Sequence, residues 1–267
     1  MAIEETLKNL PVVVVAAHPD DETIGAAGVL PWMRNPYVVH VTDGSPRNLD
    51  DARAAGFETR EAYARARRQE ALAALKLAGV DPRRTCTLQV TDQEASVNLA
   101  FISMRLTAIF RKLTPAIVLT HPYEGGHPDH DAAAFAVHAA CTRLDSRPEI
   151  YEFTSYHAKD GETDEGARAL EAGCFLAGGD SGEEVPLTGP TRECKRRMFD
   201  CFTSQLHMLR QFPIDVERFR ESPVYNFAEP PHRGRLFYEN FSWGVTGELW
   251  RHLARQAAEA LGNPPVL

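Results

Sequence analysis

The chain has 267 residues and a formal net charge of −8, which is enough length for one large domain or two small ones. This charge disfavours electrostatic binding to duplex nucleic acid or to an anionic membrane surface. No apolar run reaches the roughly 18 residues that a membrane-spanning helix needs. We therefore expect no nucleic acid partner and no membrane span.

The five cysteines are an odd number and show no C-x-x-C spacing, which indicates reduced thiols and disfavours a zinc-thiolate site. The first ten residues carry charged side chains and no apolar core of a signal peptide. Both observations favour a cytoplasmic location.

Apolar runs alternate with amphipathic segments through residue 153. Runs such as Val12–Ala17 are typical of strands that are buried on both faces of a parallel sheet. The alternation predicts βαβ units and a Rossmann-like, doubly wound, mainly parallel α/β sheet with helices on both faces. We predict strands at Val12–Ala17, Tyr37–Val41, Arg84–Val90, Ala116–Thr120 and Glu149–Phe153, and helices at Gly25–Met33, Thr59–Ala78, Val97–Leu113 and Asp131–Arg143.

The pattern changes in the last third of the chain. Residues 159–184 contain eight acidic and two basic side chains, so we expect a solvated insertion there. We expect one domain with a core at about 11–156 and a variable, irregular part at 157–267. In this part we predict strands at Cys174–Ala177 and Leu236–Phe241, helices at Thr191–Gln211 and Thr246–Leu261, and irregular chain at Phe212–Arg235. Residues 47–57 are predicted to form a surface loop.

Two similar turns follow two of the predicted strands. His18-Pro19-Asp20-Asp21-Glu22 follows the first strand, and His127-Pro128-Asp129-His130 follows the fourth. In a doubly wound sheet of order 3-2-1-4-5, strands 1 and 4 are neighbours at the switch point, where ligands bind beyond the carboxyl ends. We interpret the two turns as the halves of one metal site.

The residue types fit a catalytic metal ion. His18 and Asp21 are three residues apart and can lie on one side of a helix start, and His130 would be a third ligand. Two histidines and a carboxylate with an open position are typical of catalytic zinc, although other divalent metals are compatible. Asp20 can then act as the general base towards water. His127 can stabilise an oxyanion.

Other interpretations remain open for the same residues. Asp20 or Asp21 could cap the following helix, and His127 could be an N-cap that precedes Pro128. A nucleotide site is a weaker alternative, because Gly25-x-x-Gly28 lacks the G-x-G-x-x-G pattern and no P-loop is present.

The two motifs together resemble the LmbE/PIG-L family of zinc-dependent N-acetylsugar de-N-acetylases. Thr42-Asp43-Gly44 and Arg67-x-x-Glu70 add to the resemblance, which covers about residues 11–145. It implies the same roles for the two turns, with Asp20 finally protonating the leaving nitrogen.

The resemblance also implies that Arg67 and Asp92 face the substrate. The alternatives are an ion pair for Arg67 and a turn or helix cap for Asp92. Some family members carry an aromatic residue where this chain has Gly125, and Tyr123 is displaced from that position. His121 is either a second-layer residue or a structural one, and His232 stays unassigned.

We therefore expect a zinc-dependent hydrolase that deacetylates an N-acetyl amino sugar or its conjugate. An amidase acting on a thiol-conjugate amide and a non-catalytic Rossmann-like binding module are the alternatives. The sequence does not identify the substrate, and it is compatible with a homo-oligomer.

Overall fold

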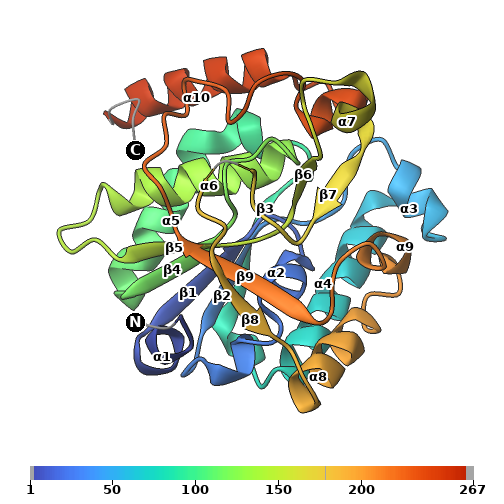
Figure 1. The fold of residues 1–267 in the computed structure, drawn as a ribbon, viewed down its shortest axis with the longest axis vertical. Coiled ribbons are helices and arrows are strands. Elements are labelled where there is room, and N and C mark those ends of the chain that lie inside the picture. Colours follow the sequence, from blue (N-terminus) through green and yellow to red (C-terminus); the bar gives the residue numbers. More distant parts are fainter. Residues whose placement is uncertain (1–2, 178, 263–267) are drawn as a thin grey trace.

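A computed structural model describes residues 3–177 and 179–262. Its main sheet has the strand order β3-β2-β1-β4-β5-β9-β8 (Figure 1). Strands β1 to β5 are parallel, whereas β9 runs antiparallel to both β5 and β8. The strands are β1 Val12–Ala16, β2 Tyr37–Thr42, β3 Thr85–Val90, β4 Ile117–Thr120, β5 Glu149–Phe153, β8 Glu183–Pro186 and β9 Val216–Glu221, and a separate hairpin pairs β6 Tyr156–Ala158 with β7 Leu170–Ala172.

The doubly wound order 3-2-1-4-5 is confirmed for the first five strands. The helices are α1 Ile3–Asn9, α2 Asp21–Ala26, α3 Asp50–Ala54, α4 Arg60–Leu77, α5 Leu99–Leu113, α6 Pro128–Cys141, α7 Asp164–Arg168, α8 Pro190–Phe199, α9 Leu206–Leu209 and α10 Gly247–Leu261, with 3-10 turns η1 Leu30–Trp32, η2 Pro82–Arg84, η3 Ala95–Asn98 and η4 Phe237–Asn240.

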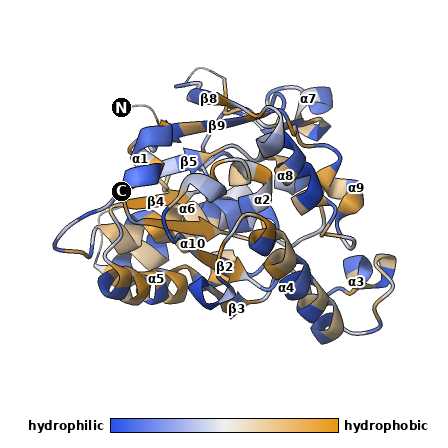
Figure 2. Ribbon diagram, turned by 90° about the horizontal axis from the view of Figure 1, so that it is seen from below, coloured by the Kyte–Doolittle hydropathy of each residue, from blue (hydrophilic) through white to orange (hydrophobic). Residues whose placement is uncertain are grey.

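Two hydrophobic cores lie on the two faces of the sheet. Side chains alternate along β1, so Val13 and Val15 pack with α5, α6 and α10, while Val12 and Val14 pack with α1, α2, α4 and α8. Figure 2 shows the central strands in hydrophobic colours, surrounded by helices with mixed surfaces. Each fully buried valine contributes about 1.5–3 kcal/mol relative to an exposed one. The central position of β1 therefore fixes the turn that follows it.

Two helix starts differ from the predicted ones. The first helix was expected at Gly25–Met33, but α2 begins at Asp21 and ends at Ala26, and only η1 follows. The helix expected from Asp131 begins at Pro128, because His127 caps it. Both polar turns therefore extend directly into helices.

The last third of the chain departs further from the predictions. The predicted strand at Leu236–Phe241 is wrong: the Leu236 N–H donates to the Glu239 carboxylate and stabilises the 3-10 turn η4. The predicted strand at Cys174–Ala177 is also wrong, since β7 ends before it and β8 begins after it. The expected helix at Thr191–Gln211 is divided into α8 and α9.

The region expected to be irregular, Phe212–Arg235, contributes strand β9 to the main sheet. Buried ion pairs hold this strand in place. Glu217 accepts from Lys195 Nζ at 3.0 Å, and Arg220 Nε donates to Glu152 at 2.7 Å. None of the helices in residues 3–177 and 179–262 has the length and hydropathy that a membrane crossing requires.

Candidate metal centre

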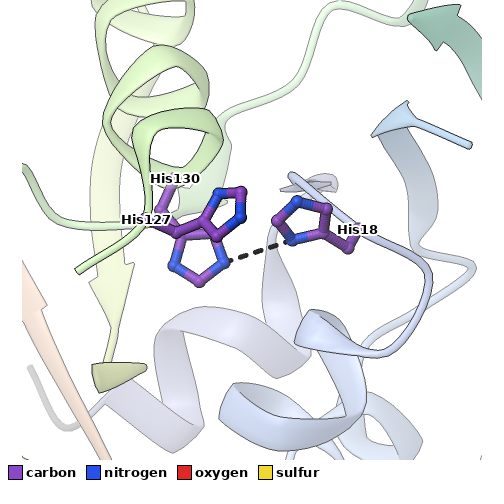
Figure 3. Close-up of side chains that lie close together, drawn as sticks. All are labelled: His18, His127 and His130. Atoms are coloured by element: carbon purple, nitrogen blue, oxygen red, sulfur yellow. Dashed lines mark hydrogen bonds between the residues drawn. The ribbon is translucent and has the colours of Figure 1, made fainter. Parts of the chain in front are cut away.

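The two His-Pro-Asp turns meet at the carboxyl ends of β1 and β4. His18 Nδ1 lies 3.1 Å from Asp21 Oδ2 and 3.3 Å from His130 Nε2, and His130 Nε2 lies 3.2 Å from Asp21 Oδ1. Figure 3 shows the rings of His18, His127 and His130 gathered at this point, with His18 and His130 in contact. All of these residues are buried.

The three donor atoms fit a small divalent metal ion. Tetrahedral zinc with bonds of about 2.0–2.1 Å holds its nitrogen and oxygen ligands roughly 3.3 Å apart. The distances among His18 Nδ1, the Asp21 carboxylate and His130 Nε2 are close to this value. A divalent ion could therefore bind here with only small movements of the side chains.

The Asp21 carboxylate also fixes the shape of the first turn. Its Oδ2 accepts the backbone N–H of His18 at 2.7 Å. Burial would raise the pKa of Asp21, but the nearby imidazoles of His130, His121 and His18 hold it well below its usual value. Asp21 is therefore an anion, as a metal ligand must be.

The second nitrogen of His18 faces two further carboxylates. His18 Nε2 lies 3.1 Å from Asp92 Oδ1 and 3.4 Å from Asp129 Oδ2. The Nε2–Asp92 contact is electrostatic, because neither atom has a well-directed hydrogen bond. Asp129 itself accepts the N–H groups of Gln93 and Ala95 at 2.6 and 3.0 Å. A carboxylate behind a metal-binding histidine fixes the tautomer and orientation of the ring.

The predicted base, Asp20, pairs with Arg67. The Arg67 Nη2 group donates to Asp20 Oδ2 at 2.9 Å, and Nη1 donates to the Gly44 carbonyl at 2.8 Å. Burial raises the pKa of Asp20 to about 7, although Arg67 acts in the opposite direction. A carboxylate with a pKa near neutrality can both accept and return a proton.

His127 is compatible with both roles expected from the sequence, the helix N-cap and the donor to an oxyanion. Its Nδ1 accepts the Asp129 N–H at 3.1 Å, so the ring is an N-cap for α6. Burial, together with the neighbouring His18 and His130, holds its pKa well below the usual value, so the ring is neutral. Because Nδ1 is an acceptor, the single ring proton lies on Nε2. His127 thus offers an N–H donor beside His18, with its ring centroid 4.5 Å away.

His121 forms a second candidate ligand group with Asp21 and His130. However, its Nε2 accepts the Ala17 N–H at 3.0 Å, so this lone pair is already used. The ring stacks on His130 with centroids 4.1 Å apart, and burial lowers its pKa to about 4. These contacts give His121 a supporting position, in contact with Asp21 at 3.3 Å.

Two residues that the sequence did not indicate lie on the other side of His130. Ser155 Oγ is 3.3 Å from His130 Nδ1, and the Tyr156 ring lies edge-on to His130 with centroids 5.2 Å apart. The pKa of Tyr156 is raised by burial and by nearby carboxylates that include Asp21. No described residue forms a hydrogen bond with its hydroxyl group, which therefore stays available to a ligand.

The Gly125-Gly126 pair explains how Tyr156 comes so close. A Cβ atom at Gly126 would lie 1.9 Å from the Tyr156 carbonyl oxygen, and Gly125 has a φ of +70°. The lack of space excludes a side chain at Gly126, and the positive φ disfavours one at Gly125. The backbone of Tyr156 on β6 can thus lie directly against this glycine pair.

Two of the unassigned aromatic side chains lie elsewhere. The Tyr123 hydroxyl donates to the Glu229 carbonyl at 2.9 Å, and its ring stacks on Trp250. The His232 ring contacts the Arg233 carbonyl on the surface. Neither side chain belongs to any of the described groups of potential metal ligands.

A cavity next to the first turn has a volume of about 510 Å³. It begins at Pro19 and extends past Asp43, Arg60 and Arg68. None of the three donor residues of the candidate metal centre lines it, so this cavity is separate from that centre.

Comparison with known sequences supports the resemblance. The profile of the PIG-L family, described as GlcNAc-PI de-N-acetylase, matches residues 13–141. A probable N-acetyl-alpha-D-glucosaminyl L-malate deacetylase 2 of Bacillus subtilis is 30% identical over 143 residues, 49% of this chain and 61% of that protein. A protein of the same description from Bacillus cereus is 28% identical over 153 residues, 52% of this chain and 66% of that protein. The chain thus spans less than two thirds of both relatives.

Solved structures share the fold. The deacetylase of teicoplanin biosynthesis has a TM-score of 0.60 at 15% identity, covering 79% of this chain and 98% of its own. The N,N'-diacetylchitobiose deacetylase of Pyrococcus horikoshii has a TM-score of 0.52 at 20% identity, covering 98% of this chain and 85% of its own. GalB, the 4-carboxy-2-hydroxymuconate hydratase of Pseudomonas putida, has a TM-score of 0.53 at 17% identity, covering 79% of this chain and 95% of its own. The fold therefore occurs in deacetylases and in a hydratase, and fold alone does not assign the reaction.

We predict that His130→Ala binds one metal ion fewer per chain than the unchanged protein. The substitution removes one of three converging donors, and elemental analysis of the dialysed protein measures the result. His138→Ala is the matched control, because this buried histidine lies on the same helix but bonds to Ser222. An unchanged metal content in folded His130→Ala would exclude His130 as a ligand.

Proposed function

From the match of residues 13–141 to the PIG-L family, we propose that this chain is a zinc-dependent hydrolase that deacetylates an N-acetyl amino sugar or its conjugate. The observation that carries the proposal is the meeting of His18, Asp21 and His130 beside the separate carboxylate of Asp20. The names of the two curated relatives support the substrate class.

The metal ligands in this proposal are His18 Nδ1, the Asp21 carboxylate and His130 Nε2. When bound, zinc would polarise a carbonyl group and lower the pKa of water towards about 7. Asp129 and Asp92 hold His18 from behind, and Ser155 does the same for His130. Such supporting contacts keep the ligand rings in one orientation.

Asp20 transfers the proton in this proposal. Arg67 occupies its Oδ2, so Oδ1 is the oxygen that takes the proton from the attacking water. The same oxygen then delivers this proton to the leaving nitrogen. A pKa of about 7 suits both steps, because the free energies of the protonated and ionised forms are close at neutral pH.

Two donors face the amide carbonyl as its oxygen gains negative charge. His127 Nε2–H is one, since its Nδ1 is engaged by the Asp129 N–H. The Tyr156 hydroxyl is the other. Donors that are fixed before the reaction stabilise the developing oxyanion without further reorganisation.

Arg67 and Asp92 act mainly through other residues in this proposal. Arg67 holds Asp20, and Asp92 contacts His18. Their predicted contacts with the substrate stay predictions.

The function is tested with a panel of N-acetylated compounds. We expect equal amounts of acetate and free amine from an N-acetylglucosamine conjugate, with loss of activity in a chelator and recovery on adding zinc. The panel includes thiol-conjugate amides and N-acetyl amino acids. Hydrolysis of thiol conjugates alone would favour the alternative amidase, and hydrolysis of no amide by metal-loaded protein would contradict the proposal.

We predict that Asp20→Ala keeps its metal but loses turnover by about 10²–10⁴-fold, the scale of a lost general base. Asp20→Asn is a more conservative substitution, since the amide oxygen of asparagine can still accept a hydrogen bond from Arg67. Metal content and kcat are measured together. Asp81→Asn is the control, because Asp81 precedes the 3-10 turn η2 and pairs with Arg83. A kcat near that of the unchanged protein would rule out Asp20 as the base.

We predict that Tyr156→Phe lowers kcat by roughly 10²-fold with little change in KM, because one oxyanion donor is lost. The ring and its contact with His130 are retained, so metal content stays the same. Tyr123→Phe is the matched control, since that hydroxyl bonds to a carbonyl outside the site. Equal kcat values for the two variants would remove Tyr156 from the mechanism.

A further inference from the structure

The β6–β7 hairpin carries a second group of metal-binding side chains. Tyr156 and His157 are consecutive on β6, so they point to opposite sides of the strand. Tyr156 contacts His130, while His157 faces away from the metal centre. On that side it meets Glu171, its cross-strand partner on β7, and Cys174, which follows the hairpin. We call these three side chains the hairpin site.

The three donors of the hairpin site differ in kind but converge. One atom each from His157, Glu171 and Cys174 lies within 4.8 Å of the others, and Cys174 Sγ is 3.9 Å from His157 Nε2. Tetrahedral zinc with bonds of about 2.3 Å to sulfur and 2.0–2.1 Å to nitrogen places those atoms roughly 3.6 Å apart. A shift of a few tenths of an ångström would bring the pair to this distance.

The orientation of His157 leaves its Nε2 available as a ligand. Its side chain is 1% exposed, and Nδ1 lies 2.8 Å from the Ala158 carbonyl oxygen, to which it donates its proton. The neutral ring then has its lone pair on Nε2, facing Cys174. Metal-binding histidines usually make this kind of bond from the second ring nitrogen.

The Glu171 side chain gives the hairpin site a negative charge. In the described part of the chain, the Glu171 carboxylate forms no ion pair or hydrogen bond with a cationic group. The guanidinium of Arg218 lies nearby, but its Nη1 donates to the Gly173 carbonyl and its Nη2 pairs with Glu184. A bound cation would displace the thiol proton of Cys174 and pair with the Glu171 carboxylate.

We propose that His157, Glu171 and Cys174 bind a second divalent metal ion of the zinc class, with water as the fourth ligand. This site is separate from the centre at His18 and goes beyond the proposed deacetylation. The spacing of cysteines alone disfavoured a zinc-thiolate site. Here, however, a single thiolate is combined with histidine and glutamate from two paired strands.

The hairpin site would hold in place a segment that contacts the metal centre. The Gly173 N–H donates to the Ser155 carbonyl at 2.9 Å, and Ser155 Oγ contacts His130. Residues 155–157 thus connect both groups of ligands. The second ion would cross-link β6 to the chain after β7 and so fix the positions of Ser155 and Tyr156.

Zinc content tests the proposal. We expect two zinc ions per chain in the unchanged protein, and one in each of Cys174→Ser, His157→Gln and His130→Ala. Cys201→Ser is the matched control, because that half-buried thiol bonds to the Arg197 carbonyl and belongs to none of the described groups of potential metal ligands, so it should keep two. One zinc per chain in the unchanged protein, lost in His130→Ala but kept in Cys174→Ser, would overturn the proposal.

Cobalt substitution provides a second readout that does not depend on activity. The proposed centre at His18 has no sulfur ligand, so thiolate-to-cobalt charge-transfer absorption reports the hairpin site alone. We expect this near-ultraviolet band in the unchanged protein and in His130→Ala, and its loss in Cys174→Ser. Absence of the band from the cobalt-loaded unchanged protein would refute the hairpin site, whether or not the chain deacetylates any substrate.

Discussion

The pairing of β1 with β4 is the constraint on which the candidate site depends. Val12 and Val14 are in register with Ile117 and Leu119, so two turns more than a hundred residues apart leave the sheet side by side. The resulting 3.3 Å contact between His18 and His130 follows from this register. The strands are held by burial on both faces, and the polar turns at their ends therefore need little local stability of their own. Hydrophobic packing thus positions the polar groups at the end of the sheet.

The parallel part of the fold could be predicted because its information is local. Val12–Ala16 is apolar without interruption, and such a run belongs in the middle of a covered sheet. Strand β9 carries Glu217 and Arg220, which are charged yet buried. Their partners, Lys195 and Glu152, lie 22 and 68 residues away. Charge patterns of this kind resemble a solvated loop until the partners are known.

In the candidate site, too, some residues could be predicted from local sequence and others could not. His18, Asp21 and His130 could be predicted because each belongs to one of the two His-Pro-Asp turns. Ser155 and Tyr156 could not, because their approach depends on the absence of a side chain at Gly126. His127 shows a further limit of sequence reasoning. Capping and catalysis were opposed as alternatives, but the cap uses Nδ1 and leaves Nε2–H for chemistry.

The charges around His18 connect metal binding to protonation. Three carboxylates, those of Asp21, Asp92 and Asp129, lie within 3.4 Å of its two ring nitrogens. Burial would lower the pKa of His18, but Asp92 and Asp21 raise it well above the usual value. Burial also raises the pKa of Asp129. Without a metal, the site therefore retains protons to offset its buried negative charge, since unpaired buried ions cost several kcal/mol each. A divalent ion would replace those protons, so metal affinity depends on the protonation of the turn.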